Sequence, residues 1–215
     1  MVSSRAARLA RTGGSGVVTA APRVLVVEDD ELLTPVIVAA LDDAGFLSRV
    51  ASSRAQARSL LAAHAWSGFM VDNGLPDGSG VELVAPIRRR HPQLPILVMT
   101  GGDVAEHTHV ALEHRAMFTT KPLPSCWVRV FTAAVTGASM RPSPRDALQM
   151  LGLTSSQLEV FALLIEGHTA AEVAARLGVK PTTVRTHCAN VYRDLHVRGL
   201  AQVLAMAAGW GRLAG

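Results

Sequence analysis

The sequence predicts an α/β domain built on a parallel sheet, followed by a small all-α domain. Two patterns support this fold class. From residue 23 to about residue 120, short β-branched runs alternate with segments of helical period. After residue 153 no strand pattern remains, and four helical segments follow. With 215 residues, 49% of them hydrophobic and 18% charged, the chain is long and apolar enough for two small globular domains, which argues against a disordered chain.

The first domain should contain five strands. Helical segments such as "LLTPVIVAALDDAG" and "VELVAPIRRRH" separate them, and a last helix is expected at about 125–135. Alternating strands and helices form βαβ units, so the five strands should run parallel. The expected strands are 23–28, 48–51, 68–72, 95–100 and 116–120.

Composition sets the expected domain boundaries. Residues 1–21 carry three arginines, no acid and no periodicity, which predicts a flexible basic arm. "TGASMRPSPRD" interrupts the helical pattern with Gly, Ser and two prolines, which predicts a linker. We therefore expect an α/β domain at 22–136, a linker at 137–152 and a helical domain at 153–215.

Charge divides along the chain as well. Residues 22–140 carry ten basic and twelve acidic side chains, whereas 141–215 carry eight basic and five acidic ones. Because Lys and Arg neutralise phosphates, a basic end on an acidic domain favours contact between that end and nucleic acid. A solvated basic face is the alternative.

The remaining bulk features predict an ordinary cytoplasmic protein. No apolar stretch approaches the roughly 18 residues that cross a bilayer, so no membrane contact is expected. Cys126 and Cys188 are far apart and have no paired metal spacing, which favours buried thiols.

The residues that close the strands form a candidate site, because ligands collect at the carboxyl ends of parallel strands. Glu28 and Asp29 close the first strand, Asp72 the third and Thr100 the fourth, and Lys121 follows the fifth. A flavodoxin-like strand order would make the first and third strands neighbours. Three carboxylates at one edge need a cation among them, and Mg²⁺ prefers such oxygen ligands.

This set of residues fits phosphoryl transfer, in which a metal ion and a lysine neutralise charge on the phosphoryl oxygens. The alternative for Glu28 and Asp29 alone is a solvated turn between strand and helix. The position of all five residues at strand ends favours the site.

The motifs "VLVVEDDE", "MVDNGLPDGSG", "PILVMTGG" and "FTTKPL" resemble the receiver domain of bacterial two-component response regulators, over about residues 22–136. The resemblance implies a flavodoxin-like (βα)5 fold. It implies that Asp72 accepts a phosphoryl group from a histidine kinase. It also implies that Glu28, Asp29, Asp72 and the backbone carbonyl of Gly74 hold Mg²⁺.

The same resemblance assigns a switch. Lys121 would hold a phosphoryl oxygen, Thr100 would move to hydrogen-bond it, and Phe118 would change rotamer together with Thr100. The segment between Thr100 and Lys121 is one residue shorter than is usual in the family. Three histidines, His107, His109 and His114, lie in this segment. Only His107 and His114 share a face at helical spacing and no third ligand is evident, which favours a polar surface over a metal site.

The four C-terminal helical segments indicate a helix-turn-helix. "LGVKP" reads as a tight turn, in which Gly178 ends one helix and Pro181 begins the next. Two segments open on capping boxes, Thr154 with Gln157 and Thr169 with Glu172.

The helix after this turn has a core face and an outer face. Val184, Val191 and Leu195 recur at helical spacing and should face the core. The candidates for contacts to base edges are Arg185, Thr186 and Ala189. The candidates for contacts to phosphates are Lys180, Thr182, Thr183 and Arg193. An ordinary amphipathic helix with a basic outer face is the alternative.

Residues 153–197 resemble the LuxR-type helix-turn-helix, and a receiver followed by this module resembles the NarL/FixJ type of response regulator. The resemblance implies a transcription regulator that forms a homodimer on phosphorylation and binds DNA. The departures are Gln157, Ala170, Ala171 and Lys180, the last standing where a serine commonly caps the recognition helix.

Two rival functions stay open. The first is a DNA-binding regulator whose receiver serves protein contacts only, without phosphorylation. The second is a Mg²⁺-dependent phosphatase, which would need a substrate pocket and a second general acid. The sequence shows no lid or cap segment for either, so we expect no enzyme.

Overall fold

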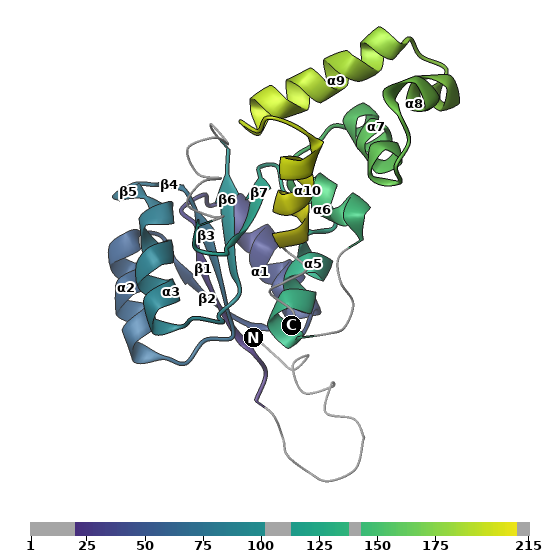
Figure 1. Cartoon of the computed structure of the whole chain (residues 1–215). Helices are drawn as coiled ribbons and strands as arrows, with labels where there is room; N and C mark the ends of the chain where they lie inside the picture. The colour runs from purple at the N-terminus through teal and green to yellow at the C-terminus, as the bar shows by residue number, and fades with distance from the viewer. Residues whose placement is uncertain (1–19, 102–112, 138–142, 210–215) are drawn as a thin grey trace, which may run out of the picture.

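The computed structural model describes residues 20–101, 113–137 and 143–209 (Figure 1). The predicted basic arm, apart from its last two residues, lies outside the described residues. So do His107, His109 and most of the shortened segment before Lys121.

The first domain is built on a five-stranded parallel sheet, which confirms the predicted fold class. The strand order is β2-β1-β3-β6-β7, and every neighbouring pair is parallel. β1, β3 and β6 are central and buried on both faces, which explains why their sequences are continuous apolar runs. The strands are β1 (Arg23–Val27), β2 (Leu47–Ala51), β3 (Gly68–Asp72), β6 (Ile96–Thr100) and β7 (Met117–Thr120).

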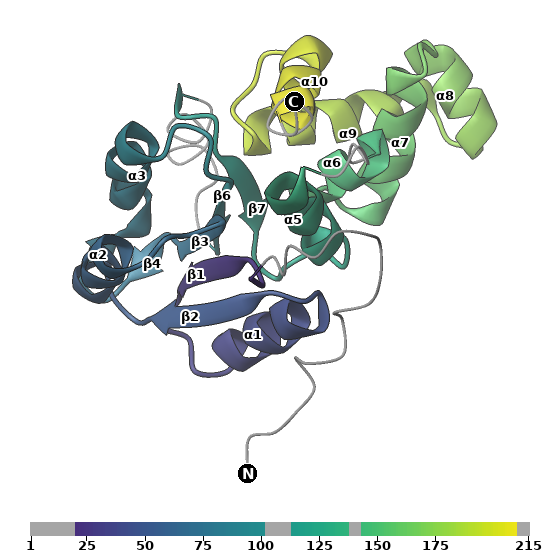
Figure 2. The same cartoon turned by 90° about the horizontal axis from the view of Figure 1, so that it is seen from below.

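Two layers of helices cover the sheet (Figure 2). α1 (Leu33–Asp43) and α5 (Trp127–Thr136) pack on one face, where Val24 and Val26 of β1 contribute to the core. α2 (Arg54–Ala63) and α3 (Val84–Arg90), the latter preceded by the 3₁₀ turn η1 (Gly80–Leu83), pack on the other. The alternation of side chains along each strand thus divides the domain into two apolar layers.

A short hairpin that is not among the five expected strands follows β3. β4 (Gly74–Leu75) pairs antiparallel with β5 (Gly78–Ser79). The Asp77 carboxylate in its turn accepts the amide protons of Arg54 (N···O 2.9 Å) and Ala55 (3.0 Å), which fixes the hairpin against the start of α2.

The C-terminal region is helical, and its capping predictions are confirmed. Both predicted capping boxes form, at Thr154 and at Thr169. Gly178 ends α8 in the left-handed region (φ 66°), and Pro181 is the first residue of α9. The helices are α6 (Pro144–Met150), α7 (Ser155–Ile165), α8 (Ala170–Leu177), α9 (Pro181–Asp194) and α10 (Leu200–Gly209).

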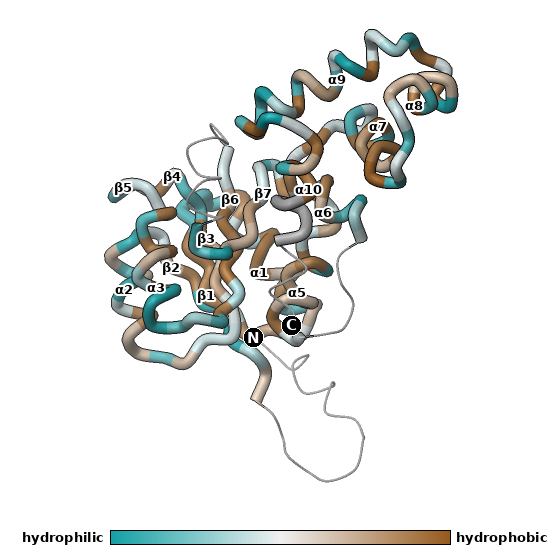
Figure 3. Tube along the Cα trace, viewed as in Figure 1, coloured by the Kyte–Doolittle hydropathy of each residue, from teal (hydrophilic) through white to brown (hydrophobic). Residues whose placement is uncertain are grey.

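The helix α6 was not expected, because the sequence pattern predicts a linker at 137–152. Ser143 opens it with a capping box to Asp146, and Pro144 is its first residue. Leu148 and Met150 are completely buried, in an apolar cluster that continues from α1 and α5 of the first domain into α7, α8 and α9. Figure 3 shows the apolar character of the central strands and the mixed character of α9.

Candidate functional site

The sheet brings the five predicted strand-end residues to one edge, and we call Glu28, Asp29, Asp72, Thr100 and Lys121 the strand-end site. Glu28, Asp72 and Thr100 are buried, whereas Asp29 is exposed. One carboxylate oxygen from each of the three acids lies within 4.8 Å of the other two. The site therefore combines a shared oxygen cluster with access from solvent.

Lys121 links two of these acids. Its ammonium nitrogen lies 2.7 Å from Glu28 Oε2 and 3.0 Å from Asp72 Oδ1. Burial raises the pKa of Glu28, and the lysine only partly offsets this effect. Burial also lowers the pKa of Lys121, but the bonds to Glu28 and Asp72 together outweigh it, and its pKa lies above the usual range. The lysine thus supplies the positive charge that the clustered acids require.

Local hydrogen bonds hold the turn after β1. The Glu28 amide donates to the Ala51 carbonyl (2.9 Å), and Glu28 Oε1 accepts the Asp30 amide proton (3.2 Å). The Asp30 Oδ1 accepts the amide protons of Leu32 (2.8 Å) and Leu33 (3.1 Å) at the start of α1. The two consecutive acids therefore differ in role. The Asp30 carboxylate accepts hydrogen bonds from the start of α1, whereas the Asp29 carboxylate belongs to the acid cluster.

The loop after Asp72 needs glycine for close packing. A Cβ on Gly80 would lie only 1.9 Å from the Asp72 backbone oxygen. The Gly80 amide donates to the Asn73 carbonyl (2.9 Å), and the Asn73 amide donates to the Met99 carbonyl (2.9 Å). Gly74 is next to the acid, because a Cβ there would lie 3.5 Å from Asp72 Oδ2.

The two predicted switch residues are both buried. Thr100 ends β6, and its carbonyl accepts the Lys121 amide proton (2.7 Å). Phe118 is paired in register with Val98 and lies in the apolar cluster beneath α2 and α3, with only 3% of its surface exposed. In this structure the aromatic ring is therefore packed inside the domain.

The outer face of α9 is open to solvent, and the helix lies at the top of the view in Figure 1. Val184, Val191 and Leu195 are buried as predicted. The predicted DNA-contact residues on or before α9 are exposed, except for the half-buried Thr183: Lys180, Thr182, Arg185, Thr186, Ala189 and Arg193. Two side chains are engaged locally, because Thr186 Oγ1 donates to the Thr182 carbonyl (3.0 Å) and Arg193 Nε to Asp194 Oδ1 (3.3 Å).

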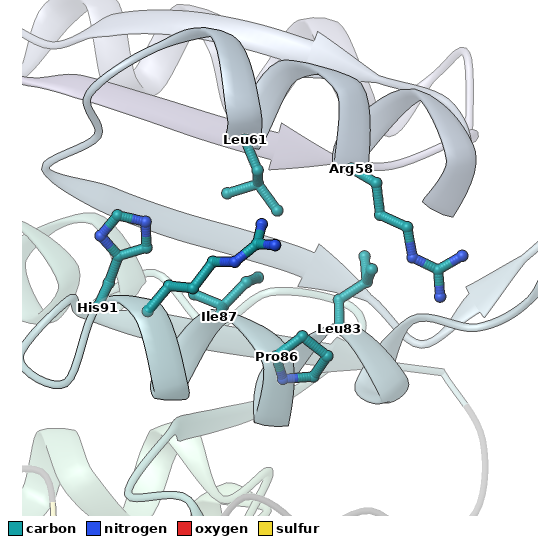
Figure 4. Close-up of a pocket in the computed structure, with 7 residues that line it drawn as sticks. Arg58, Leu61, Leu83, Pro86, Ile87 and His91 are labelled. Atoms are coloured by element: carbon teal, nitrogen blue, oxygen red, sulfur yellow. The ribbon is translucent and has the colours of Figure 1, made fainter.

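A small groove lies between α2 and α3 (Figure 4). It has a volume of ≈ 60 Å³, and none of the strand-end residues lines it. The lining residues are Arg58, Leu61, Leu83, Pro86, Ile87, Arg90 and His91. A groove of this size, away from the acids, gives the phosphatase hypothesis no substrate pocket there.

Within the described ranges, no helix is both long and apolar enough to span a membrane.

Family models match both parts of the chain. The response regulator receiver domain matches residues 24–125, and the luxR family of bacterial regulatory proteins matches residues 151–207. Both candidate regions, the strand-end site and the open face of α9, lie within these matches.

Two relatives match this chain over most of their own length. The transcriptional regulatory protein FixJ of Azorhizobium caulinodans is 25% identical, over 86% of this chain and 90% of that protein. FixJ of Rhizobium meliloti is 26% identical, over 87% of this chain and 96% of that protein. Among solved structures, the non-phosphorylated HemR receiver domain from Leptospira biflexa is 29% identical, with a TM-score of 0.49, over 56% of this chain and 98% of that one.

Proposed function

Because the chain belongs to the NarL/FixJ-type response regulators of two-component systems, in which a receiver domain is joined to a luxR-family DNA-binding domain, we propose that Asp72 is its phosphorylation site. The observation that carries this proposal is the position of Asp72 at a strand end, where Lys121 bridges it to Glu28 and where Asp29 completes the oxygen cluster. The partner would be a histidine kinase.

The residues fit Mg²⁺. Three carboxylates with ligand oxygens within 4.8 Å of one another form a hard-oxygen donor set, and the Gly74 carbonyl is the further ligand that we propose. When bound, the ion would neutralise charge on the phosphoryl oxygens. The same acids repel one another without a cation, so ion binding also relieves their repulsion.

The chain's own residues would carry out the transfer as follows. An oxygen of the Asp72 carboxylate attacks the phosphorus of the kinase phosphohistidine; the new O–P bond forms as the P–N bond breaks, and the imidazole leaves with the bonding electron pair. The Lys121 ammonium, freed from its contact with Asp72 Oδ1, binds a phosphoryl oxygen, and the Thr100 hydroxyl donates to another. Phe118 then changes rotamer with Thr100.

We further propose that phosphorylation favours a homodimer, in which two copies of α9 enter the major groove at two half-sites. The exposed face of α9 supports this proposal, since Arg185 can pair with a guanine edge while Lys180 and Arg193 meet phosphates.

Phosphorylation is tested with Mg²⁺ and acetyl phosphate, followed by intact mass measurement. We expect one phosphoryl group to be added to the wild type and none to Asp72→Asn. Equal addition to both proteins would place the phosphorylation site elsewhere.

One observation favours the second candidate, a regulator that binds DNA without phosphorylation. The face of α9 is already exposed in the structure in which Lys121 is paired with Glu28 and Asp72. For this candidate, Asp72→Asn would bind promoter DNA as tightly as the wild type treated with phosphodonor.

A further inference from the structure

A bidentate ion pair joins the receiver to the helix that precedes the DNA-binding helices. Arg129 on α5 donates from Nη1 to Asp146 Oδ2 (2.6 Å) and from Nη2 to Asp146 Oδ1 (2.5 Å). Asp146 is on α6 and only 5% exposed. Paired geometry of this kind fixes orientation as well as distance.

Asp146 also organises the start of its own helix. Its Oδ2 accepts the amide proton (3.0 Å) and the hydroxyl proton (2.8 Å) of Ser143. The Cys126 thiol, just before α5, donates to the Asp146 backbone oxygen (S···O 3.7 Å). One carboxylate therefore fixes the first turn of α6 and attaches that turn to α5.

The other end of α6 abuts the strand that leads to the strand-end site. Gly152 has φ +76°, and a Cβ on it would lie 2.4 Å from Thr120 Oγ1 and 2.9 Å from Thr120 Cγ2. Thr120 ends β7, is paired in register with Thr100 and directly precedes Lys121. The backbone of the turn after α6 thus packs on the residue next to the phosphoryl-binding lysine.

The region between the two contacts is closely packed. Leu148 and Met150 of α6 and Leu151 of the turn are almost completely buried, in the same cluster as Trp127 and Phe131 of α5. α7 begins three residues after Gly152, at Ser155, under the capping box of Thr154. A shift at the end of β7 would therefore reach the DNA-binding helices without passing through residues 138–142.

We propose that α6, held by the Arg129–Asp146 ion pair and by the contact between Thr120 and Gly152, couples the state of Asp72 to the DNA-binding domain. This inference rests on the proposed function. In the unphosphorylated protein, Lys121 is held by Glu28 and Asp72, and the docked α6 stabilises that state. Phosphorylation draws Lys121 onto the phosphoryl group, shifts the end of β7 and weakens the docking. Because coupling between equilibria is reciprocal, DNA binding that favours undocked α6 also raises the affinity of the strand-end site for a phosphoryl analogue.

Two variants break the coupling at different ends, and each has a matched control. Arg129→Gln removes the ion pair and leaves the capping box of Ser143 in place. Its control is Arg145→Gln, which changes an exposed arginine on α6 that contacts no partner in the described part of the chain.

Gly152→Ala inserts a Cβ against Thr120. Its control is Gly167→Ala, where φ is also positive (94°) but a Cβ meets nothing within 4 Å.

The measurement is the ratio of the DNA Kd values of unphosphorylated and phosphorylated full-length protein, on a DNA site chosen by selection from random sequences. We expect both variants to bind DNA more tightly when unphosphorylated and to reduce the ratio at least about five-fold, the lower end of typical allosteric coupling. Both controls should keep the wild-type ratio. Adding Thr120→Ala to Gly152→Ala should restore part of the ratio, because it removes the two closest atoms of the clash.

A second readout is the Kd for beryllofluoride, an unreactive phosphoryl analogue, with Mg²⁺, measured with and without DNA; the two values should differ in the wild type and lie closer together in Arg129→Gln. If the wild type is phosphorylated and its DNA affinity responds, but both variants keep its DNA ratio and its analogue affinities, the coupling through α6 is refuted and the proposed function stands. If the wild type takes no phosphoryl group, or if its Kd for DNA does not change on phosphorylation, both the proposed function and the coupling are refuted.

Discussion

Single residues in the strand-end site carry much of the local electrostatics. The acids at the strand ends could be predicted from the sequence, because each closes an apolar run. The sequence predicts that Lys121 lies near the acids. It does not predict which of them the lysine contacts, since the direction of a side chain depends on its tertiary neighbours. The structure adds that the lysine reaches both Glu28 and Asp72.

Lys121→Met tests this bridge. Removal of the ammonium leaves Glu28 buried beside Asp72 without a cation. We expect the free energy of unfolding without Mg²⁺ to fall by about 2 kcal/mol, less than the 3–5 kcal/mol of a fully buried pair, because the lysine side chain is 19% exposed. Urea unfolding measures the change. Mg²⁺ should reduce the loss, and an unchanged stability without Mg²⁺ would contradict the role of the lysine as the compensating charge.

Gly80→Ala tests the packing behind Asp72. The new Cβ would lie 1.9 Å from the Asp72 carbonyl oxygen, so the loop must move and carry the carboxylate with it. A displacement of about 1 Å can slow a reaction about 100-fold, and we expect a loss of this order in the rate of phosphorylation by acetyl phosphate. Gly199→Ala is the control, because a Cβ there meets nothing within 4 Å. Equal rates in both variants would show that the loop tolerates the side chain.

At the scale of elements, long periodic segments could be predicted and short ones could not. The five strands and α7 to α9 follow from hydrophobic periodicity and capping residues. The two-residue strands β4 and β5 have no periodicity to detect. α6 has only seven residues and was hidden by two nearby prolines, although "SPRD" already contained the Ser143 and Asp146 of its capping box. Its partner Arg129 is too distant in sequence to be inferred from local pattern.

The anchoring of α6 should depend on pH only in acid. The hydrogen bonds from the Arg129 guanidinium, followed by those from Ser143, lower the pKa of Asp146 from 3.8 to about 2. Since the folded-state pKa is depressed, the stabilisation is complete above 3.8 and is lost as the pH falls towards about 2. We expect the difference in unfolding free energy between the wild type and Asp146→Asn to stay constant from pH 8 to pH 5 and to shrink below pH 3.8.

Urea unfolding of both proteins across this pH range measures that difference directly. A difference that vanishes already at pH 5 would mean that the ion pair does not stabilise the charged carboxylate.

The start of α9 offers a test that separates folding from DNA contact. Lys180 occupies the N-cap position and makes no capping hydrogen bond with its side chain. Lys180→Ser supplies a capping oxygen, so we expect the free energy of unfolding to rise by about 1 kcal/mol. If Lys180 meets a phosphate, the slope of log K against log salt should fall by about one unit. A change in stability with an unchanged salt slope would show that Lys180 does not contact a DNA phosphate.

On the scale of the whole molecule, the carboxyl ends of the strands point towards the side of the molecule on which α9 lies (Figure 1), and buried side chains of α5 and α6 share the apolar cluster that continues into α7, α8 and α9. The assignment to two-component response regulators follows from sequence motifs. The contacts of α6 with the receiver could not be predicted, because they join residues far apart in the chain. In the proposed coupling, this short helix and its ion pair between the half-exposed Arg129 and the buried Asp146 would carry a chemical change in the receiver towards the DNA-binding helices.

The most direct test of the central claim is the affinity of full-length wild type and Asp72→Asn for one selected DNA site, each measured with and without acetyl phosphate and Mg²⁺. We expect the phosphodonor to tighten DNA binding by the wild type and to leave DNA binding by Asp72→Asn unchanged. Equal affinities in all four measurements would contradict phosphorylation of Asp72 as the switch.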